Sequence, residues 1–302
     1  MPSITHHYLP ITYLRRFLLR RQKKLWVFDK STSEFTEATP KESGCEDYYH
    51  AFTRKDGTVD TDSIERDLGR IETNIDGVYE KVRGEKPLTP QEWSWFFIFA
   101  GSLMVRVPSF VNRHQDFWSE VYQFAFDLVR SNPKVLKDWE HKGIATENLH
   151  NVKVTADHGV SLMMCLDSMR TPIQFFSKMG WRFLKAPPAS VFITGDSPVS
   201  YRSPSHANSI FPAGLATQDI EVIFPFSKSV CALGTWQKTD DLYVEVDPNV
   251  VLIMNCRVAR AARQYMYGPR NIARDFCLSE KTEPPNMNTE TTDPSSPACH
   301  GS

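Results

Sequence analysis

Apolar residues recur along the chain with two different periods, and the change of period separates predicted strands from predicted helices. Between residues 24 and 52 they form short runs around polar turns, which predicts a hairpin and then a further short strand. From residue 59 the spacing lengthens to three or four residues, which predicts an amphipathic helix. The apolar stripe of that helix consists of Ile64, Leu68, Ile71, Ile75, Val78 and Val82.

The first helix is expected to begin near Pro10, because the first turn of a helix tolerates a residue without an N–H group. Leu14, Phe17 and Leu18 then fall on one face of the helix. We expect this face to pack on a β-sheet and to hold the residues that precede it in one place.

The middle of the chain has the pattern of consecutive helices. They are predicted over most of residues 89–142 and 157–179, with breaks at Pro108, Pro133 and Gly143. The stretch "TPQE" at 89–92 places a threonine N-cap, a proline and a glutamate in the order of a capping box.

The thirteen-residue apolar run from Trp93 to Val105 lies within this helical region. It is too short to span a bilayer, so we expect a buried core helix. We also expect no membrane partner.

After Gly180 the pattern returns to short segments rich in β-branched and aromatic residues, which predicts strands up to about residue 246. A last helix is predicted from Pro248 to Gly268. Strands, then helices, then strands and a helix are typical of an α+β fold. We therefore predict a mixed or antiparallel β-sheet of N-terminal and C-terminal strands with a central multi-helix layer, the N-terminal strands completing the sheet of residues 180–246.

The chain is predicted to divide into one α+β domain and a polar tail. Residues 1–277 carry all the periodic segments, whereas residues 278–302 consist mainly of Pro, Ser, Thr, Asn and Glu. Such a composition buries too little apolar surface to offset the entropy of ordering, so we expect the tail to be disordered.

Composition limits the classes of function. The 302 residues are 41% hydrophobic and 24% charged with a formal net charge of -1, which argues against nucleic-acid binding through overall charge. None of the six cysteines forms a C-x-x-C pair, and the N-terminus lacks the apolar core of a signal peptide. We expect a soluble protein with reduced thiols in the cytoplasm or nucleus.

Several motifs together resemble domain-of-unknown-function family 4238, whose members begin with a pattern similar to "HHYVPQFYLRRF". This chain has "HHYLPITYLRRF" at 6–17 followed by "KLWVFDK", and the likeness extends over roughly residues 6–270. The further matching motifs are "EDYY" at 46–49, "SIERDLGRIET" at 63–73, "LMVRVP" at 103–108, "FITGDSPV" at 192–199, "IFPFS" at 223–227 and "LIMNCRVARAARQYMYG" at 252–268. Gly195 stands where the family usually has serine, and Ile11-Thr12 replaces a common Gln-Phe. The resemblance implies a shared fold and candidate positions, without a reaction.

Four residues are candidates for a site, each with a structural alternative. His7, which falls on the family pattern, suits a general base or metal ligand, or else a side chain bonded to nearby backbone. Asp196 and Glu46 lie at a strand end and a strand start, where a turn or sheet-edge role is the alternative. Arg106 is suited to clamp a phosphate or carboxylate, or to form a structural ion pair with Glu72 or Glu65.

Two neighbouring features are judged less informative. His6 is expected to be exposed. The basic run that includes Arg15, Arg16, Arg20 and Arg21 is typical of a solvated helix face, with a nucleic-acid or nucleotide partner or a nuclear import signal as alternatives.

Two classes of function remain open. The first is a hydrolase acting on a phosphate-containing substrate, nucleic acid included, with His7 as base or ligand, Asp196 and Glu46 as acidic partners, and Arg106 as clamp. One histidine and two carboxylates suffice for a hard divalent metal such as Mg²⁺ or Mn²⁺. The second is a non-catalytic binding or scaffold module in which the same residues form a structural polar network. Convergence of His7, Asp196 and Arg106 on one open pocket would favour the enzyme.

Removal of the tail after Phe276 is expected to leave the melting temperature unchanged within a few degrees, because the tail lacks core-forming residues. Thermal unfolding of the full chain and of the shortened chain measures this directly. A larger drop would mean that the tail packs on the domain.

Overall fold

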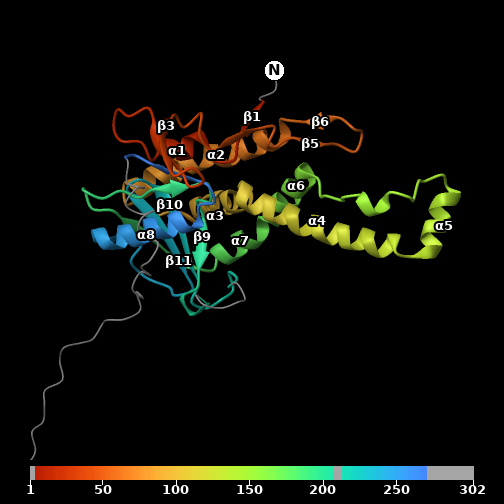
Figure 1. Ribbon diagram of the computed structural model, residues 1–302. Helices are drawn as coiled ribbons and strands as arrows, with labels where there is room; N and C mark the ends of the chain where they lie inside the picture. Colours follow the sequence, from red (N-terminus) through yellow and green to blue (C-terminus); the bar gives the residue numbers. More distant parts are fainter. Residues whose placement is uncertain (1–3, 207–212, 271–302) are drawn as a thin grey trace, which may run out of the picture.

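The chain folds as an α+β protein in the computed structural model, which describes residues 4–206 and 213–270 (Figure 1). Most strands belong to two separate sheets. The five-stranded sheet has the order β12-β7-β11-β10-β9 and is antiparallel except for β12, which runs parallel to β7. Its strands are β7 (Gly180–Lys185), β9 (Ser200–Arg202), β10 (Glu221–Ser227), β11 (Val230–Thr235) and β12 (Tyr243–Glu245).

The second sheet joins the two ends of the domain, as the sequence predicts. It has the order β3-β2-β13-β8 and is antiparallel throughout. Its strands are β2 (Leu25–Asp29), β3 (Glu34–Ala38), β8 (Thr194–Gly195) and β13 (Tyr265–Gly268). The expectation that the N-terminal strands complete the sheet of residues 180–246 is wrong, because the free edge of β2 pairs with β13 instead.

Two short strand pairs complete the β-structure. Strand β1 (Thr5–His7) pairs with β4 (Cys45–Asp47), and β5 (Phe52–Thr53) pairs with β6 (Val59–Asp60). The strand expected over residues 45–52 is therefore interrupted by a turn after β4.

The last helix, α8 (Pro248–Ala261), ends well before the predicted residue 268. The carboxylate of Asp196 accepts hydrogen bonds from the backbone N–H groups of Arg263, Gln264 and Tyr265, at 2.7, 2.7 and 2.9 Å. Those N–H groups cannot also donate within a helix, so the chain leaves α8 and continues as β13.

The helical middle follows the predicted breaks, with Pro108 and Pro133 at the starts of α4 and α5. The capping box is present: the Thr89 side chain accepts from the Glu92 N–H, and the Glu92 carboxylate accepts from the Thr89 N–H. The helices of the chain before α8 are α1 (Ile11–Arg15), α2 (Ser63–Arg83), α3 (Pro90–Val105), α4 (Pro108–Arg130), α5 (Pro133–His141), α6 (His158–Ser168) and α7 (Arg170–Phe176).

Helix α4 reaches away from the sheets and carries α5 at its far end (Figure 1). Six large hydrophobic side chains along α4 are exposed: Phe117, Val121, Tyr122, Phe124, Leu128 and Val129. Part of the helical region thus extends beyond the layer that packs on the sheets.

None of the described helices is by itself long and apolar enough to cross a membrane. Helices α3 and α4 reach the necessary length and composition only as a pair, and they are bent by 54° at their junction. Helix α3 supplies buried core residues such as Phe96, Phe99 and Leu103, as predicted.

Helix α1 is anchored in the main core. Tyr13, Leu14 and Phe17 are fully buried, and the Tyr13 ring contacts Phe17 and Phe224. The Tyr13 hydroxyl hydrogen-bonds to Thr194 Oγ1 and donates to the Pro225 carbonyl, each at 2.7 Å. This single side chain therefore ties α1 to β8 of one sheet and β10 of the other.

The substitution Phe17→Ala is expected to destabilise the protein by about 3–5 kcal/mol, because it leaves a cavity at a fully buried aromatic position. Phe124→Ala, at a position that is 71% exposed, is the matched control and should change stability by no more than about 0.5 kcal/mol. Urea denaturation of both variants compares them. Equal stability losses would show that Phe17 is not a core residue in solution.

Candidate functional site

His7 lies at the end of β1, where it is partly buried and its Nε2 is 2.9 Å from the Lys41 carbonyl oxygen. This bond to the backbone is the structural alternative considered for His7. The residue also lies near Glu72 of α2.

Arg106 is fully buried at the end of α3. Its Nε donates to the Tyr8 carbonyl oxygen at 3.0 Å, and its Nη2 forms an ion pair with Glu72 Oε1 at 3.2 Å. Burial lowers the pKa of the guanidinium, while the charges of Glu72 and Glu65 raise it. The Arg106–Glu72 ion pair is one of the two structural pairs that the sequence suggests.

Asp196 follows β8 and is 6% exposed. Both of its oxygens are occupied by the backbone N–H groups of residues 263–265, and its own N–H donates to the Tyr265 carbonyl at 2.9 Å. The preceding Gly195 allows this close approach, because a Cβ there would lie 2.8 Å from the Cβ of Ala262. The glycine at position 195, where the family usually has serine, thus has a steric reason in this chain.

Glu46 lies in β4, opposite His6 of β1, and is exposed at its surface. Desolvation by the surrounding protein raises the pKa of its carboxyl. The charges of Glu46 and Asp196 both act on the phenol of Tyr8, whose pKa is raised chiefly by burial. The two carboxylates are therefore neighbours of the same tyrosine.

The four predicted residues accordingly form two pairs that share Tyr8. Arg106 and His7 are near Glu72, and Arg106 binds the Tyr8 carbonyl. Glu46 and Asp196 are near the Tyr8 phenol. His7, Arg106 and Asp196 were expected to converge on one open pocket. Instead, each of these side chains is hydrogen-bonded to main-chain atoms.

The expectation that His6 is exposed is wrong, because its side chain is fully buried. The ring stacks on that of His50, with centroids 5.5 Å apart and an interplanar angle of 12°. Its Nδ1 accepts a hydrogen bond from the His50 backbone N–H at 2.8 Å. Alternate residues of a strand face opposite sides, so pairing of β1 with β4 turns His6 inward and leaves His7 nearer the surface.

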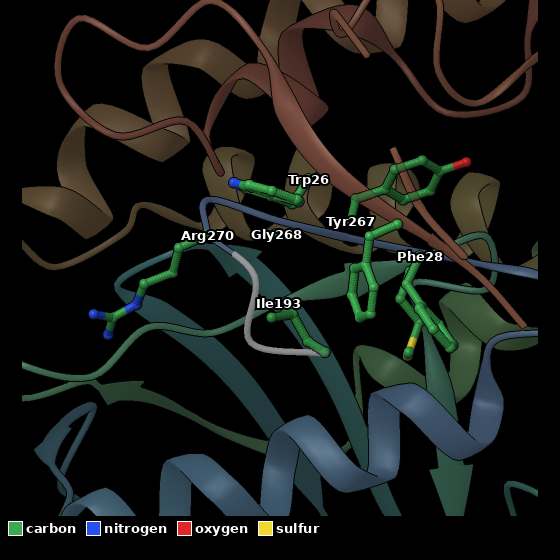
Figure 2. Close-up of a pocket in the computed structure, with 8 residues that line it drawn as sticks. Trp26, Phe28, Ile193, Tyr267, Gly268 and Arg270 are labelled. Atoms are coloured by element: carbon green, nitrogen blue, oxygen red, sulfur yellow. The ribbon is translucent and has the colours of Figure 1, made fainter. Parts of the chain in front are cut away.

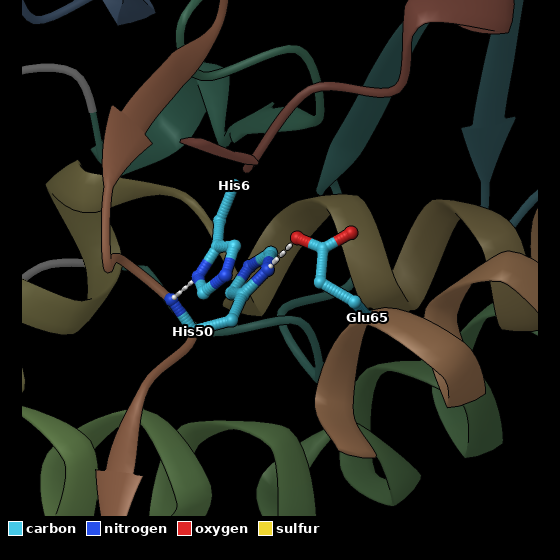
Figure 3. Close-up of side chains that lie close together, drawn as sticks. All are labelled: His6, His50 and Glu65. Carbon is cyan, nitrogen blue, oxygen red and sulfur yellow. Dashed lines mark hydrogen bonds and ion pairs between the residues drawn. The ribbon is translucent and has the colours of Figure 1, made fainter. Parts of the chain in front are cut away.

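His50 and Glu65 were not identified from the sequence as site residues. The Nδ1 of His50 is 2.5 Å from Glu65 Oε1, and the His50 side chain is completely buried (Figure 3). Burial lowers the pKa of His50. When Nδ1–H is donated to the carboxylate, Nε2 is left buried without a hydrogen-bond partner in the described residues.

These groups form a polar centre beneath β1, which we call the β1 polar centre. It consists of His6, His50, Glu65, Glu72 and Arg106. Glu65 and Glu72 are seven residues apart on α2, so two helical turns place them on the same face. Burial opposes the charge of Glu65, but the hydrogen bond from His50 and nearby positive charge outweigh it and lower its pKa. Burial raises the pKa of Glu72, partly offset by Arg106.

Three residues of this centre have the donor set of a metal ligand group. His6, His50 and Glu65 each offer one ligand atom, and these atoms lie within 4.8 Å of one another. The Glu65 side chain is 34% exposed and marks the edge where the centre meets solvent. The adjacent histidines His6 and His7 were the only sign of this ligand group that we identified in the sequence. The sequence does not show which of the two faces inward.

A small apolar pocket lies elsewhere, between β2, β13 and Ile193 (Figure 2). Its volume is about 10 Å³, which is near the least space that one water molecule needs. The aromatic rings of Trp26 and Phe28 line it, while the Arg270 side chain points away from them (Figure 2). None of the four predicted residues is part of its lining.

The basic run after α1 does not form one continuous solvated face. Arg15, Arg20 and Arg21 are exposed, whereas Arg16 is 6% exposed. Arg16 pairs with Asp76 at 2.8 Å, and its guanidinium lies 4.4 Å from the centre of the Tyr79 ring. The solvated-face interpretation therefore does not extend to Arg16, which holds α1 against α2.

Comparison with known proteins identifies a family but no relative of known activity. The model of a family described as "Protein of unknown function (DUF4238)" matches residues 5–271. No curated protein and no solved structure matches the chain.

Asp196→Ala is expected to destabilise the protein by about 2–4 kcal/mol, because three charge-assisted hydrogen bonds are lost and water replaces them only in part. His7→Ala, which loses one bond at the surface, should cost about 1 kcal/mol or less. Chemical denaturation measures both. If Asp196→Ala has native stability, the hydrogen bonds of this carboxylate do not stabilise the fold, and a chemical role becomes the better explanation.

Proposed function

The chain belongs to the DUF4238 family, whose name states no reaction, and we propose that it is a hydrolase acting on a phosphate-containing substrate at the β1 polar centre. His50 takes the role of base or ligand that the sequence suggests for His7. Arg106 supplies the positive charge for an anionic group. The observation that carries this proposal is the buried Nε2 of His50, which has no hydrogen-bond partner among residues 4–206 and 213–270, near a buried guanidinium.

The pairing of His50 with Glu65 supports a chemical role. A carboxylate that accepts Nδ1–H holds the ring in one orientation and one tautomer, with the lone pair on Nε2. The same carboxylate would stabilise the imidazolium that forms if Nε2 accepts a proton from water. Glu65 therefore has the role of a positioning residue for His50.

Arg106 supports the choice of an anionic substrate. Its Nη1 is buried without a hydrogen-bond partner in the described residues, although Nε and Nη2 are both used. The planar guanidinium matches phosphate geometry better than a lysine does. The Glu65 and Glu72 side chains, 34% and 25% exposed, form the edge at which this centre meets solvent.

A non-catalytic binding or scaffold module is the second candidate, and one observation favours it. His7, Asp196 and Arg106 each bond to main-chain groups, as residues of a structural network do. In that case Arg15, Arg20 and Arg21, which are exposed, are the surface available to a nucleic acid or nucleotide. A location in the cytoplasm or nucleus stays a prediction under either function.

The full chain is expected to hydrolyse one or more of p-nitrophenyl phosphate, bis(p-nitrophenyl) phosphate, nucleotides and short oligonucleotides. Phosphomonoesters would release inorganic phosphate, whereas diesters would release p-nitrophenol or shorter nucleotides. His50→Gln should lower kcat/KM by about 10²–10⁴-fold, because it removes the base or ligand while leaving an amide of similar size. The matched control His141→Gln, at an exposed histidine of α5, should retain the native rate. Binding of these compounds without turnover would favour the scaffold instead.

A further inference from the structure

The β1 polar centre holds more acidic groups than basic ones. Two carboxylates, Glu65 and Glu72, face one guanidinium, that of Arg106. The carboxylates at the solvent edge oppose the approach of a phosphate group, because charges in a partly buried site are only weakly screened. A divalent cation bound to Glu65 would offset this repulsion.

We propose that His6, His50 and Glu65 bind one divalent transition-metal ion of the zinc, manganese, iron, cobalt or nickel class. This inference deepens the proposed function, on which it rests for its purpose, by naming the cofactor of the same centre. The three ligands come from β1, from the turn after β4 and from the first turns of α2. They are thus brought together by the fold and not by closeness in sequence.

The three candidate ligand atoms lie within 4.8 Å of one another, around one point. A tetrahedral ion bonded at about 2.0–2.2 Å to each would hold them about 3.3–3.6 Å apart. Binding therefore requires the widest pair to close by at most about 1.5 Å and the 2.5 Å pair of His50 and Glu65 to open by about 1 Å, which side-chain rotation can supply.

The state of the ligands points in the same direction. A histidine that binds a metal must be unprotonated at the binding nitrogen. The Nδ1 of His50 faces Glu65 Oε1 at 2.5 Å, so an ion shared by these two residues takes the place of the proton between them and leaves the N–H on Nε2. His6 is fully buried against His50, so both rings are already shielded from competing water.

The donor set decides the class of ion. Two imidazole nitrogens and one carboxylate oxygen suit first-row transition metals, whereas Mg²⁺ and Ca²⁺ prefer oxygen ligands throughout. We therefore expect Zn²⁺ or Mn²⁺ to bind in preference to Mg²⁺. Arg106 and Glu72 remain outside the ligand group, where they hold β1 and α2 in place.

The test is titration of the chelator-treated full chain with ZnCl₂, MnCl₂ and MgCl₂ by calorimetry. We expect one equivalent of Zn²⁺ or Mn²⁺ to bind and Mg²⁺ to bind far more weakly. Glu65→Gln and His50→Ala should each weaken binding by at least about 100-fold. The exposed control His141→Gln should bind as the native chain does. Absence of transition-metal binding by the native chain would overturn the proposal.

A second measurement distinguishes loss of metal binding from loss of folding in a variant. Glu65→Gln changes only a partly exposed carboxylate, so circular dichroism should show a native fold. With Co²⁺ as the probe, the native chain should show visible absorption bands of bound cobalt that this variant loses. Unchanged bands in folded Glu65→Gln would reject Glu65 as a ligand and with it the proposed ion site.

The two proposals fail separately. Metal binding without hydrolysis of any tested compound would retain the ion site and reject the hydrolase. Hydrolysis that depends on His50 but persists after complete removal of metal would reject the ion as the cofactor of this centre and retain His50 as a base.

Discussion

The full burial of the Arg106 guanidinium is the constraint on which the arrangement around the N-terminus depends. A buried charge is tolerated only when it is paired and hydrogen-bonded. Glu72 of α2 supplies the opposite charge, and the Tyr8 carbonyl accepts from Nε. The Tyr49 hydroxyl in turn donates to the Arg106 carbonyl at 2.8 Å. Strand β1, helix α2 and the turn after β4 are thus all held at the junction of α3 and α4.

The same constraint assembles the β1 polar centre. With Glu72 fixed on Arg106, Glu65 must lie two turns earlier on the same face of α2, where it meets His50. With the Tyr8 carbonyl fixed on the same guanidinium, the strand residues before it lie over the turn after β4, and His6 stacks on His50. A structural network and a chemically capable centre are therefore made by one set of contacts.

Asp196 plays the corresponding part at the end of α8. By binding three backbone N–H groups it ends α8 and directs the chain into β13, the strand that pairs with both β2 and β8. Tyr13 then joins this sheet to the five-stranded sheet through Thr194 and Pro225. The N-terminal segment is consequently fixed to both sheets, which gives the β1 polar centre a rigid support.

Features that depend on residues a few positions apart were determined by the sequence itself: the capping box at Thr89, the helix starts at Pro108 and Pro133, and the hairpin of β2 and β3. The sequence also required a partner for Arg106, because a charge after a long apolar run must be neutralised. Only the tertiary structure decided which of His6 and His7 faces inward, since strand alternation is symmetrical until a neighbouring strand covers one side. It alone ended the last helix at Ala261, because the carboxylate that takes the next N–H groups comes from a residue more than sixty positions earlier.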